Sequence, residues 1–302
     1  MENMNELYEK ARKCHEEKDY ELARDWYLKA ARLGHVDAMY EAAKLYANRF
    51  VACFDYGLAL KWYEEAANHG HLEAQFDLGE TYQYGFFTKK NIKKALKYYE
   101  MAALGGHVAS QIELGSYYGY ELSKHRDINK AISWFEMAAK TGCEIAYKCL
   151  ARIYEDGKDV AQDIPLAIKY YKLAAEQEEV DSCLRLGYIY ANGVGVEKNA
   201  LEAIKWYKVA AEHEYDLAQL RLGDYYFIGD EVEQDYQEAF KWYSLAAKNG
   251  SLAGQYQLGW CYFEGFGVNM DVNRAKEIWI EAADEGYEDA ILALKEFFDI
   301  EE

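Results

Sequence analysis

The sequence predicts an all-α protein, a right-handed α-solenoid of about eight helix–loop–helix repeats, each 36 residues long. Three observations predict it: a strict period, an apolar face with helical spacing in every period, and capping residues at matching places. No stretch alternates apolar and polar residues with the period of two that a half-buried strand requires. We therefore expect about sixteen or seventeen helices and no sheet.

The dipeptide Ala-Ala sets the period. It recurs every 36 residues in eight copies, which is too regular for composition alone. The copies begin at Ala30, Ala66, Ala102, Ala138, Ala174, Ala210, Ala246 and Ala282.

Each copy lies at the end of an apolar helix face. A large apolar pair stands four residues before each Ala-Ala, and a further alanine stands three residues before the pair. The spacing i, i+3, i+4, i+7, i+8 is typical of one face of an α-helix, here the second helix of each repeat. The pairs are Trp26-Tyr27, Trp62-Tyr63, Tyr98-Tyr99, Trp134-Phe135, Tyr170-Tyr171, Trp206-Tyr207, Trp242-Tyr243 and Ile278-Trp279.

An Asp or Asn precedes every second helix. We interpret these residues as N-caps, because a short side-chain oxygen can accept a hydrogen bond from a free backbone N–H there. A catalytic or metal role is the less favoured alternative, since capping explains all of them. They are Asp19, Asp55, Asn91, Asp127, Asp163, Asn199, Asp235 and Asp271.

The first helix carries the motif Leu-Gly-x-x-Tyr in five of the repeats, as at Leu186-Gly187 with Tyr190. Repeat two has Ala42-Ala43 with Tyr46 instead, and repeat five has Leu150-Ala151 with Tyr154. A glycine inside a helix costs about 1 kcal/mol relative to alanine. Its recurrence predicts that another helix passes too close for a larger side chain. Loop glycines follow this helix, as in Gly193-Val194-Gly195-Val196, where the valine is expected to pack on the core.

A glycine also ends most second helices, as the residue that most readily adopts a left-handed conformation. Glu178 and Glu214 stand at that place in repeats five and six. We expect these two turns to differ and the stack to bend there, because a left-handed non-glycine residue is costly. The glycines are Gly34, Gly70, Gly106, Gly142, Gly250 and Gly286.

Taken together, Leu-Gly-x-x-Tyr, Gly-x-Gly-Val, Asp-x-x-x-Ala and Trp-Tyr-x-x-Ala-Ala-x-x-Gly closely resemble the Sel-one-like repeat, a branch of the tetratricopeptide superfamily. The resemblance covers nearly the whole chain and is fullest in repeats six and eight. The first repeat departs from it with a shorter loop, and repeats two and four lack the loop glycines. The resemblance implies a curved superhelix that binds proteins or peptides as an adaptor or regulator.

The domain organisation that follows is one solenoid over residues 1–302. The expected repeats are approximately 1–35, 36–71, 72–107, 108–143, 144–179, 180–215, 216–251 and 252–287, with a capping helix over 288–300.

Charge narrows the choice of partner. The chain has 34 Lys and Arg against 53 Asp and Glu, a net charge of −19. Such a surface repels phosphate, so nucleic acid and anionic membrane are expected to be poor partners, whereas a basic protein fits. The alternative is that the charge serves solubility. No signal peptide and no long apolar run is present, so we expect a cytoplasmic protein without membrane insertion, with export by a specialised route left open.

The binding face is expected on the first helices. In tetratricopeptide proteins these helices line the concave side, so the resemblance implies that residues flanking each Leu-Gly contact a partner. Trp260 and Tyr256 are the expected anchors, because large aromatic side chains dominate interface energy. The alternative is that the rings pack between repeats. The candidates are Leu184, Tyr188, Leu220, Asp224, Phe227, Tyr256, Trp260, Phe263, Tyr84 and Tyr120.

No pattern indicates catalysis, a cofactor or a metal. The six cysteines fall at unrelated places in the period, which predicts reduced, mostly buried thiols without a disulfide. His35, His71 and His107 recur with the period, but neighbouring repeats lie roughly 10 Å apart, too far to share one ion. The glycine loops lack the Lys and Ser/Thr of a phosphate-binding loop. We therefore predict a non-enzymatic adaptor; a dedicated inhibitor or immunity protein, or an exported effector, would look alike in sequence.

Overall fold

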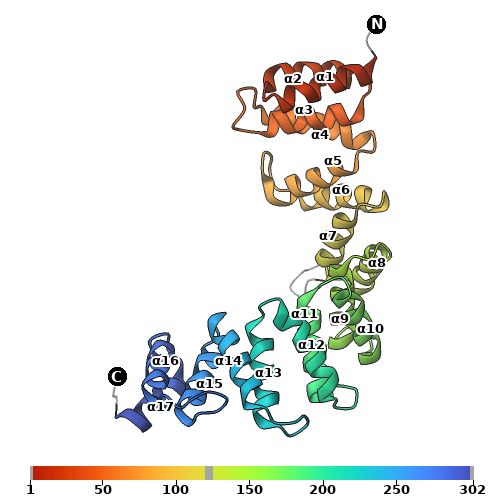
Figure 1. Ribbon diagram of the computed structural model, residues 1–302. Coiled ribbons are helices and arrows are strands. Elements are labelled where there is room, and N and C mark those ends of the chain that lie inside the picture. Colours follow the sequence, from red (N-terminus) through yellow and green to blue (C-terminus); the bar gives the residue numbers. More distant parts are fainter. Residues whose placement is uncertain (1–2, 120–124, 300–302) are drawn as a thin grey trace. The chain divides into compact units, whose positions relative to one another are not determined.

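The computed structural model describes residues 3–119 and 125–299. Over these ranges the protein contains seventeen α-helices, one π-helical turn and no strand (Figure 1). The all-α repeat solenoid is thereby confirmed. The final helix, α17 (Glu288–Phe298), packs on the helix before it and contributes Ala290 and Leu294 to a core around Trp279.

Odd-numbered helices are the first, and even-numbered helices the second, of each pair. The first helices are α1 (Met4–Glu16), α3 (Val36–Ala47), α5 (Leu72–Glu80), α7 (Val108–Gly119), α9 (Glu144–Asp156), α11 (Val180–Asn192), α13 (Asp216–Ile228) and α15 (Leu252–Glu264). The second helices are α2 (Tyr20–Arg32), α4 (Tyr56–Asn68), α6 (Ile92–Leu104), α8 (Ile128–Ala139), α10 (Ile164–Ala175), α12 (Ala200–Glu212), α14 (Tyr236–Lys248) and α16 (Val272–Asp284).

The chain divides into two compact units, Met1–Ala146 and Tyr147–Glu302. We call them the N-terminal unit and the C-terminal unit. In each, successive helices pack against one another as antiparallel neighbours (Figure 1). The alanines and the second aromatic residue of each pair fill the seams, with Ala23, Ala59, Ala203 and Ala239 at 0% exposure.

All eight predicted N-caps of the second helices are confirmed. Each Asp or Asn side chain accepts a hydrogen bond from a backbone N–H in the first turn, as Asp163 does from Leu166 at 2.9 Å. In seven of the eight the same residue also closes the loop, because its own N–H donates to the carbonyl of the tyrosine that ends the first-helix motif; Asp19 donates to Cys14 instead. Asn199 donates to Tyr190 in this way at 2.9 Å. One residue therefore both starts the second helix and fixes its distance from the first.

The helical glycines lie under aromatic rings. A Cβ at Gly187 would overlap the Tyr207 ring, and one at Gly259 would overlap the Trp279 ring. The predicted close approach is confirmed, and the group that approaches is the second ring of the aromatic pair rather than the neighbouring backbone. A large side chain at this place would drive the two helices of a repeat apart.

The prediction that the turns at Glu178 and Glu214 differ is wrong. Both residues adopt the left-handed conformation, with φ of 63° and 64°. Their N–H groups donate to Ala175 and Ala211 at 3.1 Å, as Gly70 donates to Ala67 at 3.0 Å. The hydrogen bonds of the turn hold this conformation, so the glutamates carry its backbone strain.

The loop glycines agree with the predictions, and the cysteines agree only in part. Gly193 and Gly195 have positive φ, and Val194 and Val196 pack against the core as predicted. The six cysteines are free, but only Cys183 and Cys261 are buried, so the prediction of mostly buried thiols is wrong. No helix in the described part of the chain is long and apolar enough to cross a membrane.

Candidate protein-binding face of the C-terminal unit

Three of the predicted binding residues meet at the C-terminal end of the solenoid. Tyr256, Trp260 and Phe263 of α15 are half-buried. The Trp260 ring lies 5.3 Å from that of Trp279 and 5.4 Å from that of Phe297 on α17, between centroids. The cluster therefore joins the last repeat to its covering helix and leaves these rings only partly exposed.

Three further candidates form part of the seams between helices. Leu184 packs against the core around Tyr207, and Leu220 and Phe227 pack against the core around Tyr243. The Phe227 ring lies 5.2 Å from the Phe266 ring of the next repeat. These side chains are half-buried, so each offers an edge rather than a face to a partner.

Tyr188 and Asp224 line a cleft of about 380 Å³ between α11 and α13. Sequence reasoning missed the other lining residues that matter most: Arg221, Tyr225 and Ile228. Tyr188 is 45% and Ile228 64% exposed, so the cleft combines apolar surface with charge. Arg221 and Ile228 lie one helical turn from Asp224, so extending the same helix face by one turn would have found them, whereas Tyr225 directly follows Asp224.

The polar groups of the cleft are held in place. The Tyr243 hydroxyl donates to Asp224 at 3.0 Å, and Arg221 donates to the other carboxylate oxygen at 3.2 Å. Burial raises the pKa of Asp224, against the lowering effect of these two donors. On the other side, Arg185 holds the buried Glu155 at 2.8 Å through Nε. Its guanidinium lies 4.7 Å from the Tyr188 ring centroid, which orients that ring.

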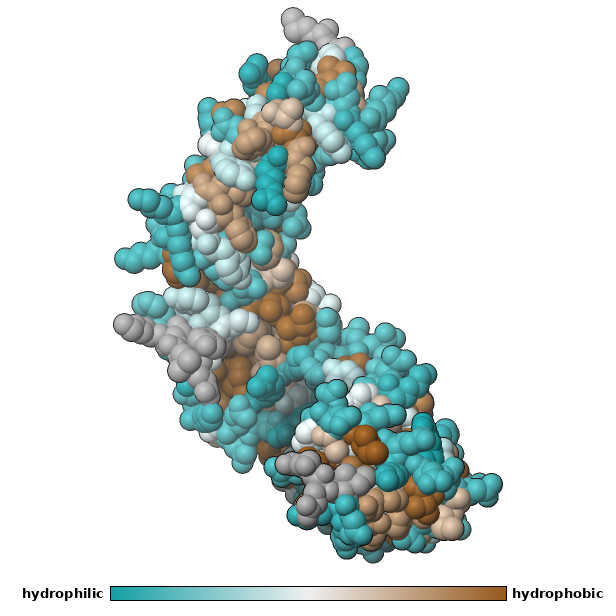
Figure 2. Space-filling view, turned by 90° about the vertical axis from the view of Figure 1, so that its left-hand side faces the viewer, coloured by the Kyte–Doolittle hydropathy of each residue, from teal (hydrophilic) through white to brown (hydrophobic). Residues whose placement is uncertain are grey.

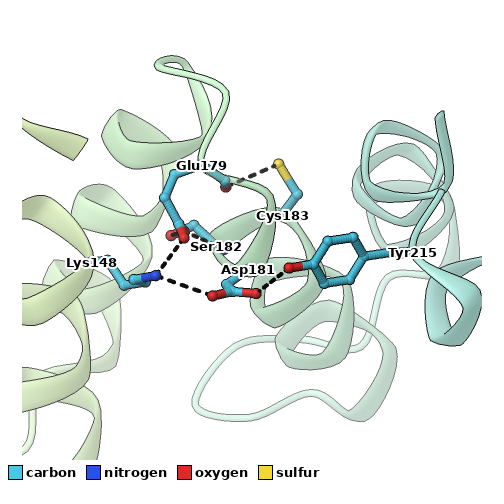
Figure 3. Close-up of polar contacts among 6 residues, drawn as sticks. All are labelled: Lys148, Glu179, Asp181, Ser182, Cys183 and Tyr215. Atoms are coloured by element: carbon cyan, nitrogen blue, oxygen red, sulfur yellow. Dashed lines mark hydrogen bonds and ion pairs between the residues drawn. The ribbon is translucent and has the colours of Figure 1, made fainter. Parts of the chain in front are cut away.

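A polar network spans the starts of three first helices (Figure 3). Lys148 of α9 contacts Glu179 at 2.6 Å and Asp181 of α11 at 3.1 Å, and the Tyr215 hydroxyl donates to Asp181 at 2.8 Å. Glu179 also caps α11 by accepting from the Ser182 N–H at 2.7 Å.

The titration behaviour follows from these contacts. The pKa of Asp181 is lowered, first by the Tyr215 hydrogen bond and then by the Lys148 hydrogen bond. Partial burial alone would lower the pKa of Lys148, but the bonds to the two carboxylates outweigh it and raise the pKa. Lys148 and Asp181 therefore stay charged near neutral pH, and the contacts of the network fix the spacing of α9, α11 and α13.

A comparison with models of protein families shows to which family the chain belongs. The Sel1 repeat model matches eight times, over residues 7–35, 36–71, 72–107, 108–143, 150–179, 180–215, 216–251 and 252–287. The chain belongs to the Sel1 repeat family.

Two solved structures resemble this Sel1 repeat protein closely. One is a protective antigen present in uropathogenic Escherichia coli strains that displays an SLR fold, with 30% identity and a TM-score of 0.81 over 91% of this chain. This chain spans 59% of that protein's length. The other is a Sel1 repeat protein from Oxalobacter formigenes, with 30% identity and a TM-score of 0.77 over 97% of this chain and 86% of that one. No curated protein matches the sequence significantly.

The remaining two candidates of this Sel1 repeat protein belong to the N-terminal unit. Tyr84 is 55% exposed and lies in the π-helical turn Thr81–Gly85. Tyr120 lies outside the described residues.

The periodic histidines have a structural role that sequence reasoning missed. His35, His71 and His107 are N-caps of first helices: His71 Nδ1 accepts from the Ala74 N–H at 3.1 Å. Its Nε2 lies 3.5 Å from Asp37, and its ring stacks on Tyr40 at 4.3 Å. Their place directly before each first helix was the available signal. Among the described residues, no group of three His, Cys, Asp or Glu side chains could hold a metal ion.

The charge of this Sel1 repeat protein is concentrated in one unit. Residues 147–302 contain 31 acidic and 15 basic side chains, a net charge of −16. Residues 1–146 contain 22 acidic and 19 basic side chains, a net charge of −3. The cleft between α11 and α13 thus lies in the strongly acidic unit.

Proposed function

We propose that this protein is a non-enzymatic scaffold that binds a basic protein or peptide on the first-helix face of its C-terminal unit. Sel1 repeat proteins generally mediate protein–protein interaction, which supports the general class. The cleft between α11 and α13 carries the specific proposal. It offers the exposed side chains of Tyr188 and Ile228 within a unit of net charge −16.

The cleft suits a side chain that is both apolar and cationic. Tyrosine rings and Ile228 provide contact area, while Asp224, Asp230 and Glu231 provide negative charge. Of these, Asp224 is engaged by Arg221 at 3.2 Å and Glu231 by Lys198 at 2.5 Å, so Asp230 is the most accessible carboxylate. An arginine or lysine on the partner could pack its aliphatic part on the rings and place its charge among the carboxylates. Charge of this kind steers association more than it adds affinity.

The test is capture of partners from native cytosol on the full chain. We expect a basic protein to bind the wild type and to be lost from the double variant Tyr188→Ala with Ile228→Ala. Leu104→Ala, a substitution at a 74% exposed leucine of the N-terminal unit, is the matched control and should retain it. Equal capture by wild type, cleft variant and control would contradict the proposed site.

A second readout separates scaffold from inhibitor. If the captured protein is an enzyme and loses activity on binding, this protein acts as a dedicated inhibitor through the same surface. With either role, the association rate should fall by about tenfold or more from low to high salt, since screening shortens the reach of the acidic field. An association rate independent of salt would assign the acidity to solubility alone.

A further inference from the structure

The N-terminal unit carries a basic segment that the proposed function does not use. Between Glu80 and Glu100 the chain has no acidic residue and five lysines. All five are exposed, in a protein of net charge −19. Lys94 donates to the Tyr82 hydroxyl at 3.1 Å and keeps its charge in solvent. The lysines are Lys89, Lys90, Lys93, Lys94 and Lys97.

Exposed aromatic rings surround this segment. Phe50 is 85%, Phe86 62% and Phe54 52% exposed. Phenylalanine is among the residues most often buried, so three exposed rings in two neighbouring loops indicate a contact surface. Each ring lies in the loop between the first and second helix of repeat two or repeat three.

Ring contacts make the two loops one surface. Phe87 of the second loop stacks on Tyr56 at 5.3 Å, and Tyr56 contacts Phe54 at 6.0 Å, between centroids. Tyr84 lies 5.4 Å from Phe86. Both loops project to the same side of the N-terminal unit (Figure 1), and Figure 2 shows that side, where hydrophobic side chains lie against hydrophilic ones. We call residues 49–56 and 84–97 the loop edge.

The backbone of repeat three is also unusual. Helix α5 ends at Glu80 and continues as the π-helical turn Thr81–Gly85, whose Gly85 has φ of 78°. Such turns insert an extra residue into a helix and frequently occur at functional sites. Here the exposed Tyr84 lies within the turn, and the exposed Phe86 follows it directly.

We propose that the loop edge docks this protein on an anionic lipid bilayer. Exposed lysines with phenylalanines are the composition of surfaces that adsorb to membrane interfaces. Protein–protein interfaces, by contrast, are depleted in lysine, and their energy concentrates in Trp, Tyr and Arg. The rings lie in exposed loops, and a fluid lipid surface accepts them without a shape-matched pocket.

Adsorption to the bilayer depends mainly on the groups close to its surface. Lysine stems lie along the interface with the ammonium groups at headgroup phosphates, while the phenylalanine rings enter the headgroup layer. The Debye length is about 8 Å at physiological salt, so acidic groups farther away oppose adsorption only weakly. Two carboxylates lie close to the segment: Asp55 accepts from the Leu58 N–H at 3.0 Å as an N-cap, and Glu64 accepts from the Tyr82 hydroxyl at 2.9 Å. The five lysines outnumber them. The inference goes beyond the proposed function, since it concerns another unit and another class of partner.

The test is co-sedimentation of the full chain with vesicles of phosphatidylcholine alone or with about one third phosphatidylserine. We expect binding to the anionic vesicles only. Replacing Lys89, Lys90 and Lys93 by Gln should weaken it by more than tenfold, because each such lysine contributes about fivefold. The control replaces Lys205, Lys208 and Lys241 of the C-terminal unit by Gln and should bind like the wild type.

A second pair of variants tests the rings. Phe50→Ser with Phe86→Ser should weaken binding, whereas Leu201→Ser, at a 71% exposed position, should not. A melting temperature equal to the wild type shows that the variants fold. No binding to anionic vesicles, or equal binding by the lysine variant and its control, would overturn the proposal. Binding of single-stranded RNA or of an acidic peptide in place of vesicles would overturn it as well.

Discussion

The two units share one repeat but join their first helices differently. In the N-terminal unit, His71 and His107 cap α5 and α7 and contact Asp37 and Glu73, the acidic residue 34 positions earlier, at 3.5 and 3.4 Å. In the C-terminal unit, Tyr215 stands at the same place in the period and donates to Asp181, again 34 positions earlier, at 2.8 Å. The repeat therefore fixes where the contact is made, and the type of residue that makes it differs between the units.

The units also differ in the hydrogen bonding of the tyrosine rings that cover Gly79 and Gly223. Tyr99 and Tyr243 occupy equivalent places and both are at 1% exposure, over Gly79 and Gly223. The Tyr243 hydroxyl donates to Asp224, whereas the Tyr99 hydroxyl is buried and has no hydrogen-bond partner among the described residues. Repeat three uses this ring for packing alone, and repeat seven also uses it to position a residue of the cleft.

The largest difference between the units should appear on removing these hydroxyls. Tyr243→Phe should lower the free energy of unfolding by about 1.5–3 kcal/mol, because a hydrogen bond to a buried carboxylate is lost. Tyr99→Phe should leave it unchanged or raise it by about 1 kcal/mol, because an unsatisfied buried group is removed. Denaturant unfolding of both variants gives the comparison, and equal losses would mean that Tyr99 has a partner.

A smaller effect is expected at the turns that follow the second helices. Glu214→Gly should stabilise the protein by about 1 kcal/mol, since a left-handed glutamate costs about 1–2 kcal/mol and glycine does not. Gly70→Glu, the reverse change in the N-terminal unit, should destabilise it by a similar amount. Melting curves of the two variants measure this. A destabilising Glu214→Gly would show that the glutamate side chain makes a favourable contact that exceeds the backbone strain.

The smallest effect concerns pH. Burial lowers the pKa of His71 in the folded protein, against the raising effect of Asp37 and Glu73. The unfolded chain therefore takes up the proton first, so this contribution to stability is complete above pH 6.5 and is lost as the pH falls below it.

The matched variants are His71→Asn, which keeps a capping oxygen, and Tyr215→Phe. The wild type should exceed His71→Asn in free energy of unfolding at pH 7.5. This advantage should fall by up to about 1 kcal/mol between pH 7.5 and pH 5.5. The difference for Tyr215→Phe should stay constant. A difference for His71→Asn that is flat over this range would show that the imidazole does not titrate with folding.

Much of the fold could be predicted because the second helix repeats in identity as well as in spacing. The N-caps, the Ala-Ala pairs and the helical glycines each have one physical solution, so the period alone located them. The turns at Glu178 and Glu214 could not be predicted from propensity, because neighbouring hydrogen bonds impose their conformation. The first-helix faces vary between repeats, and their exposure depends on contacts about 34 residues away, such as that of Tyr215 with Asp181.

The residues of the candidate site were predicted only in part. Helix periodicity placed Tyr188 and Trp260 at equivalent positions, 72 residues apart. The structure separates them: Tyr188 opens on the cleft, and Trp260 packs between Trp279 and α17. That difference arises because the last repeat is covered by α17 instead of by another complete repeat.

The most direct test of the proposed binding face measures melting temperature and partner affinity together for Tyr188→Ala and Trp260→Ala. We expect Tyr188→Ala to weaken binding by about 2 kcal/mol while melting like the wild type. We expect Trp260→Ala mainly to lower the melting temperature, because a largely packed ring is lost. Unchanged partner affinity in Tyr188→Ala, with a fall in melting temperature instead, would contradict the assignment of the cleft as the binding site.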